Sequence, residues 1–257
     1  MSRILVIGDI HGNYRGLKQV LERSNFDYKN DTLISLGDIV DGWSESVECV
    51  DELLKIKNLI CIRGNHDVWI QDFFKTGIKP LIWTQNGGIS TIDSYIKSGK
   101  LLDPMHKIFF EDQRDWYIDD ENRLFIHAGW DHSYVPEEIN VGNISKRKLF
   151  EIQASLKVNA GTNAKECNWD RSLWQDVKSS CTFPVRESDF EPIKQFKEVY
   201  IGHTTTRSSS PENYSNVWNM DSGSGWHGRL SIMDVDSKEI WQSDFSTLLY
   251  PDEKGRG

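Results

Sequence analysis

Three copies of one pattern constrain this fold more than any other feature of the sequence. In each copy an apolar run ends in a glycine and a polar side chain. The runs are Arg3 to Ile7, Thr32 to Leu36 and Leu59 to Ile62, and they lead into Gly8-Asp9, Gly37-Asp38 and Gly64-Asn65. Apolar residues at helical spacing follow the first two copies. Strand-to-helix units about thirty residues apart are typical of right-handed βαβ crossovers. We therefore predict an α/β fold whose polar motifs meet where the carboxyl ends of parallel strands form a ligand crevice.

The second half of the chain predicts a second sheet packed on the first. Two extended runs end at His127 and at Gly202-His203. The runs Val217 to Met220, Leu230 to Val235 and Glu239 to Trp241 alternate, and we interpret them as a terminal antiparallel set. We expect one domain over residues 1–257, with a polar insertion over the site at about residues 131–170 that carries one helical stretch around Lys146 to Leu156. We expect Pro251 to Gly257 to be frayed.

Composition excludes several classes of protein. The net charge of -9 argues against an extended nucleic-acid surface, because phosphate contacts require a clustered excess of Lys and Arg. The apolar run before Gly8 is too short for a signal sequence or a membrane span. Four cysteines without paired CxxC spacing are expected to be free thiols in a reducing cytoplasm. We expect a globular cytoplasmic protein, and the sequence leaves its oligomeric state open.

Five polar motifs recur along the chain in order. They are Gly8-Asp9-Ile10-His11-Gly12, Gly37-Asp38-Ile39-Val40-Asp41, Gly64-Asn65-His66-Asp67, Ile126-His127-Ala128-Gly129 and Gly202-His203-Thr204. Together they supply carboxylate, amide and imidazole groups, which suit divalent metals that activate water. Each residue alone has a plainer interpretation, since a histidine after a strand is more often a packing residue and an aspartate a helix cap. The ordered set favours metal ligation instead.

The spacing divides the candidate ligands between two ions. Asp9 and His11 alternate on one extended segment, so both can face one ion. Asp38 can bridge a pair of ions about 4 Å apart, because a carboxylate has two oxygens. The second ion would take Asn65, His127 and His203. A neutral amide in this set limits the negative charge of a site that must admit a phosphate anion.

This ordered set resembles the calcineurin-like metallophosphoesterases, especially the phosphoprotein phosphatase branch with the small serine/threonine phosphatases of bacteria and bacteriophages. The resemblance covers nearly the whole length, from Asp9 to Asp221-Ser222-Gly223. It implies two mixed β-sheets packed as a sandwich and flanked by helices. It also implies the two-metal ligand set given above, with manganese as the expected metal and iron or zinc as alternatives.

The same resemblance implies roles for three further residues. It makes His66 the general acid, oriented by Asp41, and Arg171 the arginine that grips phosphate. Their chemistry agrees, because an imidazole can donate a proton near neutral pH and a guanidinium fork matches phosphate. The plainer alternatives are a surface hydrogen bond between His66 and Asp41 and an ordinary salt bridge of Arg171 at a helix start.

Two positions depart from the protein phosphatase pattern. Gly42-Trp43 stands where those enzymes have Arg-Gly, so one phosphate-binding arginine is missing. Asp67 stands where they have Glu, and it resembles the symmetrical diadenosine tetraphosphate hydrolases of the same superfamily. Those hydrolases, however, generally lack an acid that matches Asp41.

We therefore predict a two-metal phosphoesterase that hydrolyses phosphomonoesters, with phosphoserine or phosphothreonine in protein as the first substrate class. The alternative is a nucleotide or diadenosine-tetraphosphate hydrolase. The acidic charge disfavours a phosphodiesterase or nuclease, and a non-catalytic binding module would require the loss of a ligand or of the acid. A further hypothesis is that one or two of the tryptophans near the motifs form an aromatic wall for a base or aryl group; these are Trp43, Trp69, Trp130 and Trp169.

Overall fold

The computed structural model describes residues 2–132, 145–155, 165–182 and 193–256. The first of its two five-stranded sheets has the strand order β10-β9-β1-β2-β3. Its strands are β1 (Ile4–Ile7), β2 (Thr32–Ser35), β3 (Asn58–Cys61), β9 (Ser231–Asp234) and β10 (Ile240–Gln242). The first three strands are parallel, as the repeated sequence pattern predicts, and β9 and β10 add an antiparallel edge.

The second sheet has the order β4-β5-β6-β8-β7. Its strands are β4 (Trp116–Ile118), β5 (Arg123–Ile126), β6 (Glu198–Ile201), β7 (Glu212–Tyr214) and β8 (Val217–Asn219). Strands β5, β6 and β8 are parallel, and the two edge strands are antiparallel to their neighbours. Both sheets are therefore mixed.

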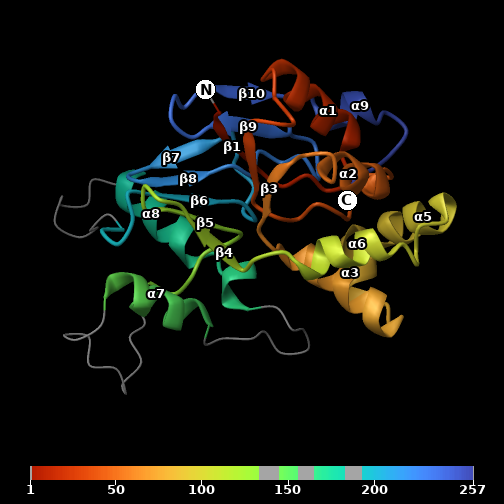
Figure 1. The fold of residues 1–257 in the computed structure, drawn as a ribbon, viewed down its shortest axis with the longest axis horizontal. Coiled ribbons are helices and arrows are strands. Elements are labelled where there is room, and N and C mark those ends of the chain that lie inside the picture. The colour runs from red at the N-terminus through yellow and green to blue at the C-terminus, as the bar shows by residue number, and fades with distance from the viewer. Residues whose placement is uncertain (1, 133–144, 156–164, 183–192, 257) are drawn as a thin grey trace.

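Helices cover the outer faces of the two sheets (Figure 1). Those near the first sheet are α1 (Tyr14–Arg23), α2 (Ser46–Leu53), α3 (Asn65–Thr76), α4 (Leu81–Trp83), α5 (Ile89–Ser98), α6 (Pro104–Glu111), α9 (Ser246–Leu249) and the π-helical turn η1 (Thr84–Gly88). Those near the second sheet are α7 (Lys146–Ser155), α8 (Ser172–Thr182) and the 3-10 turn η3 (Glu166–Asn168). The predicted sandwich flanked by helices is confirmed.

Strand side chains explain the layering. In β1, Leu5 and Ile7 pack in the helix-side core, whereas Val6 packs between the sheets. In β5, Phe125 packs between the sheets and stacks on Tyr200 of β6, with ring centroids 4.8 Å apart. Successive strand side chains point to opposite faces, so a strand buried on both faces needs a continuous apolar run. These runs made the strands recognisable in the sequence.

The expectation of one terminal antiparallel set is wrong. Strand β8 pairs in parallel with β6, whereas β9 and β10 belong to the other sheet. Strand β9 is buried on both faces, with Ile232 in the helix-side core and Met233 between the sheets. Such a strand is stable in the sheet interior, beside β1, and not at the end of a meander. The alternation of apolar and polar residues thus identified the strands but not the strands with which they pair.

The expectation of a frayed segment after Pro251 is also wrong for the residues that the structure describes. Glu253 accepts hydrogen bonds from the backbone N–H (3.0 Å) and the hydroxyl (2.8 Å) of Ser44. The backbone N–H of Arg256 donates to the carbonyl of Gly225 (3.0 Å). This segment is therefore anchored against the loop that follows Asp41, and the C-terminus lies near α2 (Figure 1).

Much of the expected insertion lies outside the described residues, which omit 133–144 and 156–164. Within the described part, the helical stretch expected around Lys146 is α7. The extent of the insertion, its place over the site and the single domain stay predictions. No helix among the described residues is long and apolar enough to cross a membrane.

Candidate metal centre

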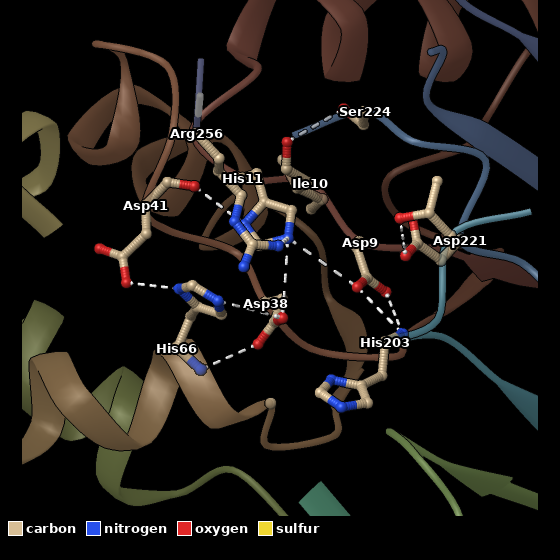
Figure 2. Close-up of polar contacts among 12 residues, drawn as sticks. Asp9, Ile10, His11, Asp38, Asp41, His66, His203, Asp221, Ser224 and Arg256 are labelled. Carbon is tan, nitrogen blue, oxygen red and sulfur yellow. Dashed lines mark hydrogen bonds and ion pairs between the residues drawn. The ribbon is translucent and has the colours of Figure 1, made fainter. Parts of the chain in front are cut away.

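The six candidate ligands converge at the carboxyl ends of strands from both sheets. From the first sheet, Asp9 and His11 follow β1, Asp38 follows β2 and Asn65 opens α3 after β3; from the second, His127 follows β5 and His203 follows β6. Five of the site residues, Asp9, His11, Asp38, His66 and His203, gather in Figure 2. Residues separated by up to 194 positions therefore meet in one place, as the backbone N–H of His203 and the carboxylate of Asp9 do (3.0 Å).

Asp38 lies at the centre of the cluster. Its Oδ2 lies 3.6 Å from Nε2 of His11 and 3.4 Å from Nε2 of His127. Nε2 of His127 is also 3.2 Å from Oδ1 of Asn65. Two groups of ligand atoms could hold a metal ion, each with its atoms within 4.8 Å of one another: Asp38 with His127 and His203, and Asp38 with His11 and His66. Asp9 lies beside the second group, with Oδ2 3.9 Å from Nε2 of His11.

The backbone is unusual at four of the site residues. His11, Asp38, Asp41 and His203 have φ values of 57°, 50°, 71° and 65°, so all four are left-handed. Nine non-glycine residues among those described have positive φ, and four of the nine are these site residues. Left-handed residues other than glycine cost about 1–3 kcal/mol each and persist where other interactions hold them. The fold therefore uses strained turns to aim these side chains.

Hydrogen bonds fix which nitrogen of each imidazole faces the centre. Nδ1 of His11 lies 2.8 Å from the carbonyl of Asp41, and Nδ1 of His127 lies 2.7 Å from the carbonyl of Leu36. A carbonyl only accepts, so Nδ1 carries the proton and Nε2 presents its lone pair to the cluster. Nε2 of His203 is buried without a hydrogen-bond partner in the described part of the chain. Imidazole lone pairs that face buried carboxylates together form a site suited to a cation.

The electrostatics lead to the same conclusion. Burial, together with the nearby Asp221 carboxylate, raises the pKa of Asp9. Burial alone would lower the pKa of His127, but the Asp38 carboxylate outweighs it and raises this pKa to about 9. Without a cation, the protein must therefore hold protons among these groups. Metal binding displaces such protons, so the donor set fits divalent metal ions.

A buried dyad adjoins this cluster. Nδ1 of His66 lies 2.7 Å from Oδ2 of Asp41, and His66 Nε2 lies 4.0 Å from Oδ2 of Asp38. Asp41 also accepts hydrogen bonds from the Trp83 indole N–H and the Thr91 hydroxyl, both at 2.7 Å. Burial raises the pKa of Asp41 and lowers that of His66. The two supporting donors lie in helical segments with no motif, so they could not be predicted from the sequence.

Asp67 connects two of the motif loops. Its carboxylate accepts backbone N–H groups of Asp38 (2.9 Å), Ile39 (2.9 Å) and Gly64 (3.0 Å). Burial and the Asp38 carboxylate raise its pKa to about 6. Sequence reasoning used Asp67 only as a mark of substrate class and missed that it positions Asp38.

Two arginines contact the cluster, whereas Trp43 is buried in the core. Nη1 of Arg171 donates to the carbonyl of His203 and to the hydroxyl of Thr204, both at 3.1 Å. Trp43 is fully buried, and its indole N–H donates to the Ser224 carbonyl (2.7 Å). The aromatic-wall hypothesis is therefore wrong for Trp43. Arg256, which the sequence analysis left in a frayed segment, places Nη1 3.2 Å from Nε2 of His11.

The comparison with protein families decides the affiliation. The model of the family described as calcineurin-like phosphoesterase matches residues 2–160. The chain belongs to the calcineurin-like phosphoesterases. It is thus a metal-dependent phosphoric ester hydrolase, and its two groups of buried Asp and His side chains could each hold a metal ion. The resemblance inferred from the five motifs is confirmed.

Relatives of two kinds are similar to this calcineurin-like phosphoesterase. A symmetrical bis(5'-nucleosyl)-tetraphosphatase of Pasteurella multocida is 24% identical over 92% of this chain and 94% of its own length. Serine/threonine-protein phosphatase 1 of Salmonella typhimurium is 34% identical, but over only 33% of this chain and 38% of its own. The stronger local match and the longer weak match are therefore to proteins named for different substrates.

Solved structures show the same fold. A putative diadenosine tetraphosphatase superposes with a TM-score of 0.56 at 17% identity and covers 94% of this chain and 92% of its own. A protein serine/threonine phosphatase of Saccharomyces cerevisiae gives 0.54 at 17% identity, over 98% of this chain and 82% of its own. At this identity the likeness concerns the fold alone.

Proposed function

We propose that this phosphoesterase holds two divalent metal ions, manganese first and iron or zinc as alternatives. Asp9, His11 and Asp38 would hold one ion, and Asp38, Asn65, His127 and His203 the other. The unpartnered Nε2 of buried His203 and the central place of Asp38 support this division. Such ions, when bound, withdraw charge from phosphoryl oxygens and lower the pKa of water.

We propose that the reaction is hydrolysis of phosphomonoesters, with phosphoserine and phosphothreonine in protein as substrates. The observation that carries this proposal is the buried contact between Asp41 and His66 (2.7 Å) beside the metal-binding groups. Asp41 holds the Nδ1 proton of His66 and orients the ring, so that Nε2 can deliver a proton to the leaving oxygen. An alkoxide is a strongly basic leaving group, so an alkyl phosphate requires this proton more than an aryl phosphate does.

Arg171 would bind the phosphoryl group at the side of His203. Its Nη1 is held by the His203 carbonyl and the Thr204 hydroxyl, which keeps its guanidinium beside the site. A guanidinium offers five N–H donors in a fixed plane, so donors beyond these two contacts can reach a phosphate.

The experiment compares His66→Asn with the wild type on a panel of substrates, with manganese present. The panel contains a phosphoserine peptide, an aryl monophosphate, an aryl diester and diadenosine tetraphosphate. We expect the phosphopeptide and the aryl monophosphate to be hydrolysed. His66→Asn should lower turnover of the phosphopeptide by about 10² to 10⁴, and that of the aryl ester by less.

Metal analysis serves as the control for this variant, because His66 lies within reach of Asp38. The variant should keep the manganese content of the wild type. Equal losses on the alkyl and aryl esters at unchanged metal content would show that His66 is not the general acid. A wild-type protein that hydrolyses none of the four substrates would refute the proposed reaction.

A second candidate function is hydrolysis of dinucleoside tetraphosphates. Two observations favour it: the symmetrical tetraphosphatase of Pasteurella multocida aligns over 92% of this chain, and Asp67 stands where protein phosphatases have Glu. Against it, Trp43 is buried and offers no stacking surface for a base. The second candidate is correct if diadenosine tetraphosphate is turned over faster than the phosphopeptide in the same panel.

We also propose that the enzyme works in the cytoplasm. All four cysteines are free, two of them buried, which suits a reducing compartment. Because the net charge is -9, we propose no extended surface for binding nucleic acid.

A further inference from the structure

Arg256 extends from the segment Pro251 to Arg256 into the metal centre. Figure 2 shows its side chain beside His11, on the way to the groups around Asp38. Nη1 of Arg256 lies 3.2 Å from Nε2 of His11, the nitrogen that also faces Asp9 and Asp38. This segment is distant in sequence from every motif, so a role for it was not apparent until the fold was known.

Contacts with the loop after Asp41 hold this segment in place. Glu253 accepts two hydrogen bonds from Ser44, and the backbone N–H of Arg256 donates to Gly225. A Cβ at Gly255 would come within 2.9 Å of the Trp43 ring, so the segment passes directly over this buried indole. Trp43 also stacks on Tyr250, with ring centroids 4.9 Å apart and planes inclined by 19°. Trp43 thus supports the segment and does not face substrate.

Gly42 leaves the space that Arg256 fills. A Cβ at Gly42 would lie 3.2 Å from Cγ of Arg256 and 3.0 Å from the carbonyl oxygen of His11. A larger side chain at position 42 and the observed Arg256 side chain therefore compete for one volume. In the protein phosphatase pattern described above, an arginine stands at this position. This chain has no cation at position 42, and Arg256 brings one to the site from another segment.

The guanidinium of Arg256 makes no direct ion pair with a carboxylate within the described part of the chain, although it lies close enough to Asp41 and Asp221 to oppose the rise in pKa that burial causes in both. Its nearest polar contact is His11, and its Nε is buried without a hydrogen bond. Its other contact is the ring of Trp226, whose centroid lies 5.1 Å from Cζ. The side chain is half-buried, so its guanidinium stays accessible from the metal centre. A guanidinium fork matches two oxygens of a phosphate. Arg256 therefore has hydrogen-bond donors beside the metal centre that can reach an anion there.

We propose that Arg256 binds the phosphoryl group of the substrate at the metal centre, in place of the arginine that Gly42 omits. The inference rests on the proposed function, since it assigns a binding residue to that same site. The segment Pro251 to Arg256 is then part of the substrate site, and its contacts with Ser44 and Trp43 position the guanidinium.

The test measures binding of inorganic phosphate to the manganese-loaded protein by titration calorimetry, for the wild type and three variants. Arg256→Met removes the charge, and Arg256→Lys keeps the charge but removes the fork. Lys254→Met is the matched control, because it removes one positive charge from an exposed side chain of the same segment. Manganese affinity and thermal unfolding are measured for each variant without phosphate.

We expect Arg256→Met to weaken phosphate binding by about 10- to 100-fold, which is typical for a lost charge-assisted hydrogen bond. Arg256→Lys should lie between this variant and the wild type, and it provides the test if Arg256→Met does not fold. Lys254→Met should stay within about 3-fold of the wild type. Manganese affinity should change by no more than about 3-fold in all variants.

Several results would overturn the assignment. Equal phosphate affinity in Arg256→Met, Arg256→Lys and the wild type would remove Arg256 from the substrate site and leave the proposed function intact, provided that the wild type hydrolyses the aryl monophosphate. Tighter manganese binding by Arg256→Met with unchanged phosphate affinity would show that Arg256 only stands in for a cation beside His11. A wild type that takes up manganese but neither binds phosphate nor hydrolyses any ester would refute both.

Discussion

The carboxylate of Asp41 is held by more hydrogen bonds than its role as a partner of His66 requires. Oδ1 accepts from the Thr91 hydroxyl and Oδ2 from both Trp83 and His66. The backbone N–H of Asp41 in turn donates to the Thr91 oxygen (2.9 Å). A buried charge tolerates burial only when such donors surround it, so Thr91 and Trp83 keep Asp41 in its place against His66.

Thr91→Val tests this arrangement. The change keeps the shape of the side chain but leaves the Oδ1 atom and the N–H of buried Asp41 without their partner. We expect the free energy of unfolding to fall by about 1–3 kcal/mol, the usual cost of unsatisfied buried polar groups. Urea denaturation measures it. Thr91→Ser is the control, because it keeps the hydroxyl. If the two variants were equally stable, the hydroxyl would contribute nothing.

Gly64→Ala tests the close packing of the loops against the ligands. A Cβ at Gly64 would lie 2.1 Å from Oδ1 of Asp38, although the backbone there (φ -84°) is acceptable for any residue. We expect the methyl group to displace Asp38 and to weaken manganese binding by at least about 10-fold. Gly77→Ala is the control, because its Cβ would meet nothing within 4 Å while its φ of +70° adds only local strain. Manganese titration should separate the two variants, and equal affinities would contradict the expectation.

At the scale of elements, the sequence predicted strands well and their neighbours poorly. The apolar runs identified β1 and β2 because these strands are buried on both faces. The edge strand β3 is only half-buried, but its apolar side chains pack against the core on both faces. The same reasoning could not assign β8 and β9 to different sheets, because pairing depends on contacts between distant segments. The anchoring of the segment Pro251 to Arg256 was unpredictable for the same reason, because it depends on contacts with Ser44 and Gly225, which are distant in sequence. The motif residues were predictable because ligand chemistry selects residue types, whereas Thr91 and Arg256 belong to no pattern.

Helix α2 carries a buried acid that should make stability depend on pH. Glu52 accepts from Lys18 (3.1 Å), Tyr28 (2.5 Å) and Lys55 (2.7 Å). Burial raises the pKa of this carboxyl, but the three hydrogen bonds outweigh burial and lower it overall. A lowered pKa means that the stabilisation is complete above the unfolded-state pKa of about 4.3 and is lost as the pH falls through the folded-state value.

Glu52→Gln should therefore destabilise the protein near neutral pH by about 1–3 kcal/mol, because it removes a charge from three donors. The difference from the wild type should stay constant above about pH 5 and shrink as the pH falls below about 4.3. Urea denaturation at several pH values measures it. Glu48→Gln, on the exposed side of the same helix, is the control and should change stability by less than about 0.5 kcal/mol. A difference independent of pH would contradict the assignment.

At the scale of the whole molecule, the site joins the two sheets. Asp9, His11 and Asp38 come from strands of the first sheet, whereas His127 and His203 come from the second. The core between the sheets is apolar, with Val6, Ile34 and Phe125 fully buried, and it ends at this polar cluster. The extended and alternating runs of the sequence predicted a second sheet packed on the first, and the family resemblance added the sandwich of two mixed sheets flanked by helices.

Metal removal should therefore loosen the molecule as a whole. Without a cation, burial and the nearby Asp221 carboxylate disfavour the charged form of Asp9 and raise its pKa. The two sheets also lose the metal ions that residues from both sheets would hold. A ligand at 100 times its dissociation constant stabilises the folded state by about 2.7 kcal/mol. For a chain of this size that corresponds to a fall in Tm of roughly 5–11 °C when EDTA replaces excess manganese. Calorimetric melting measures the change in Tm.

Asp38→Asn should abolish most of this fall in Tm. Asp93→Asn, which changes an exposed acid on α5, should leave the fall in Tm as it is in the wild type. An equal response in both variants would place the stabilising metal elsewhere in the protein.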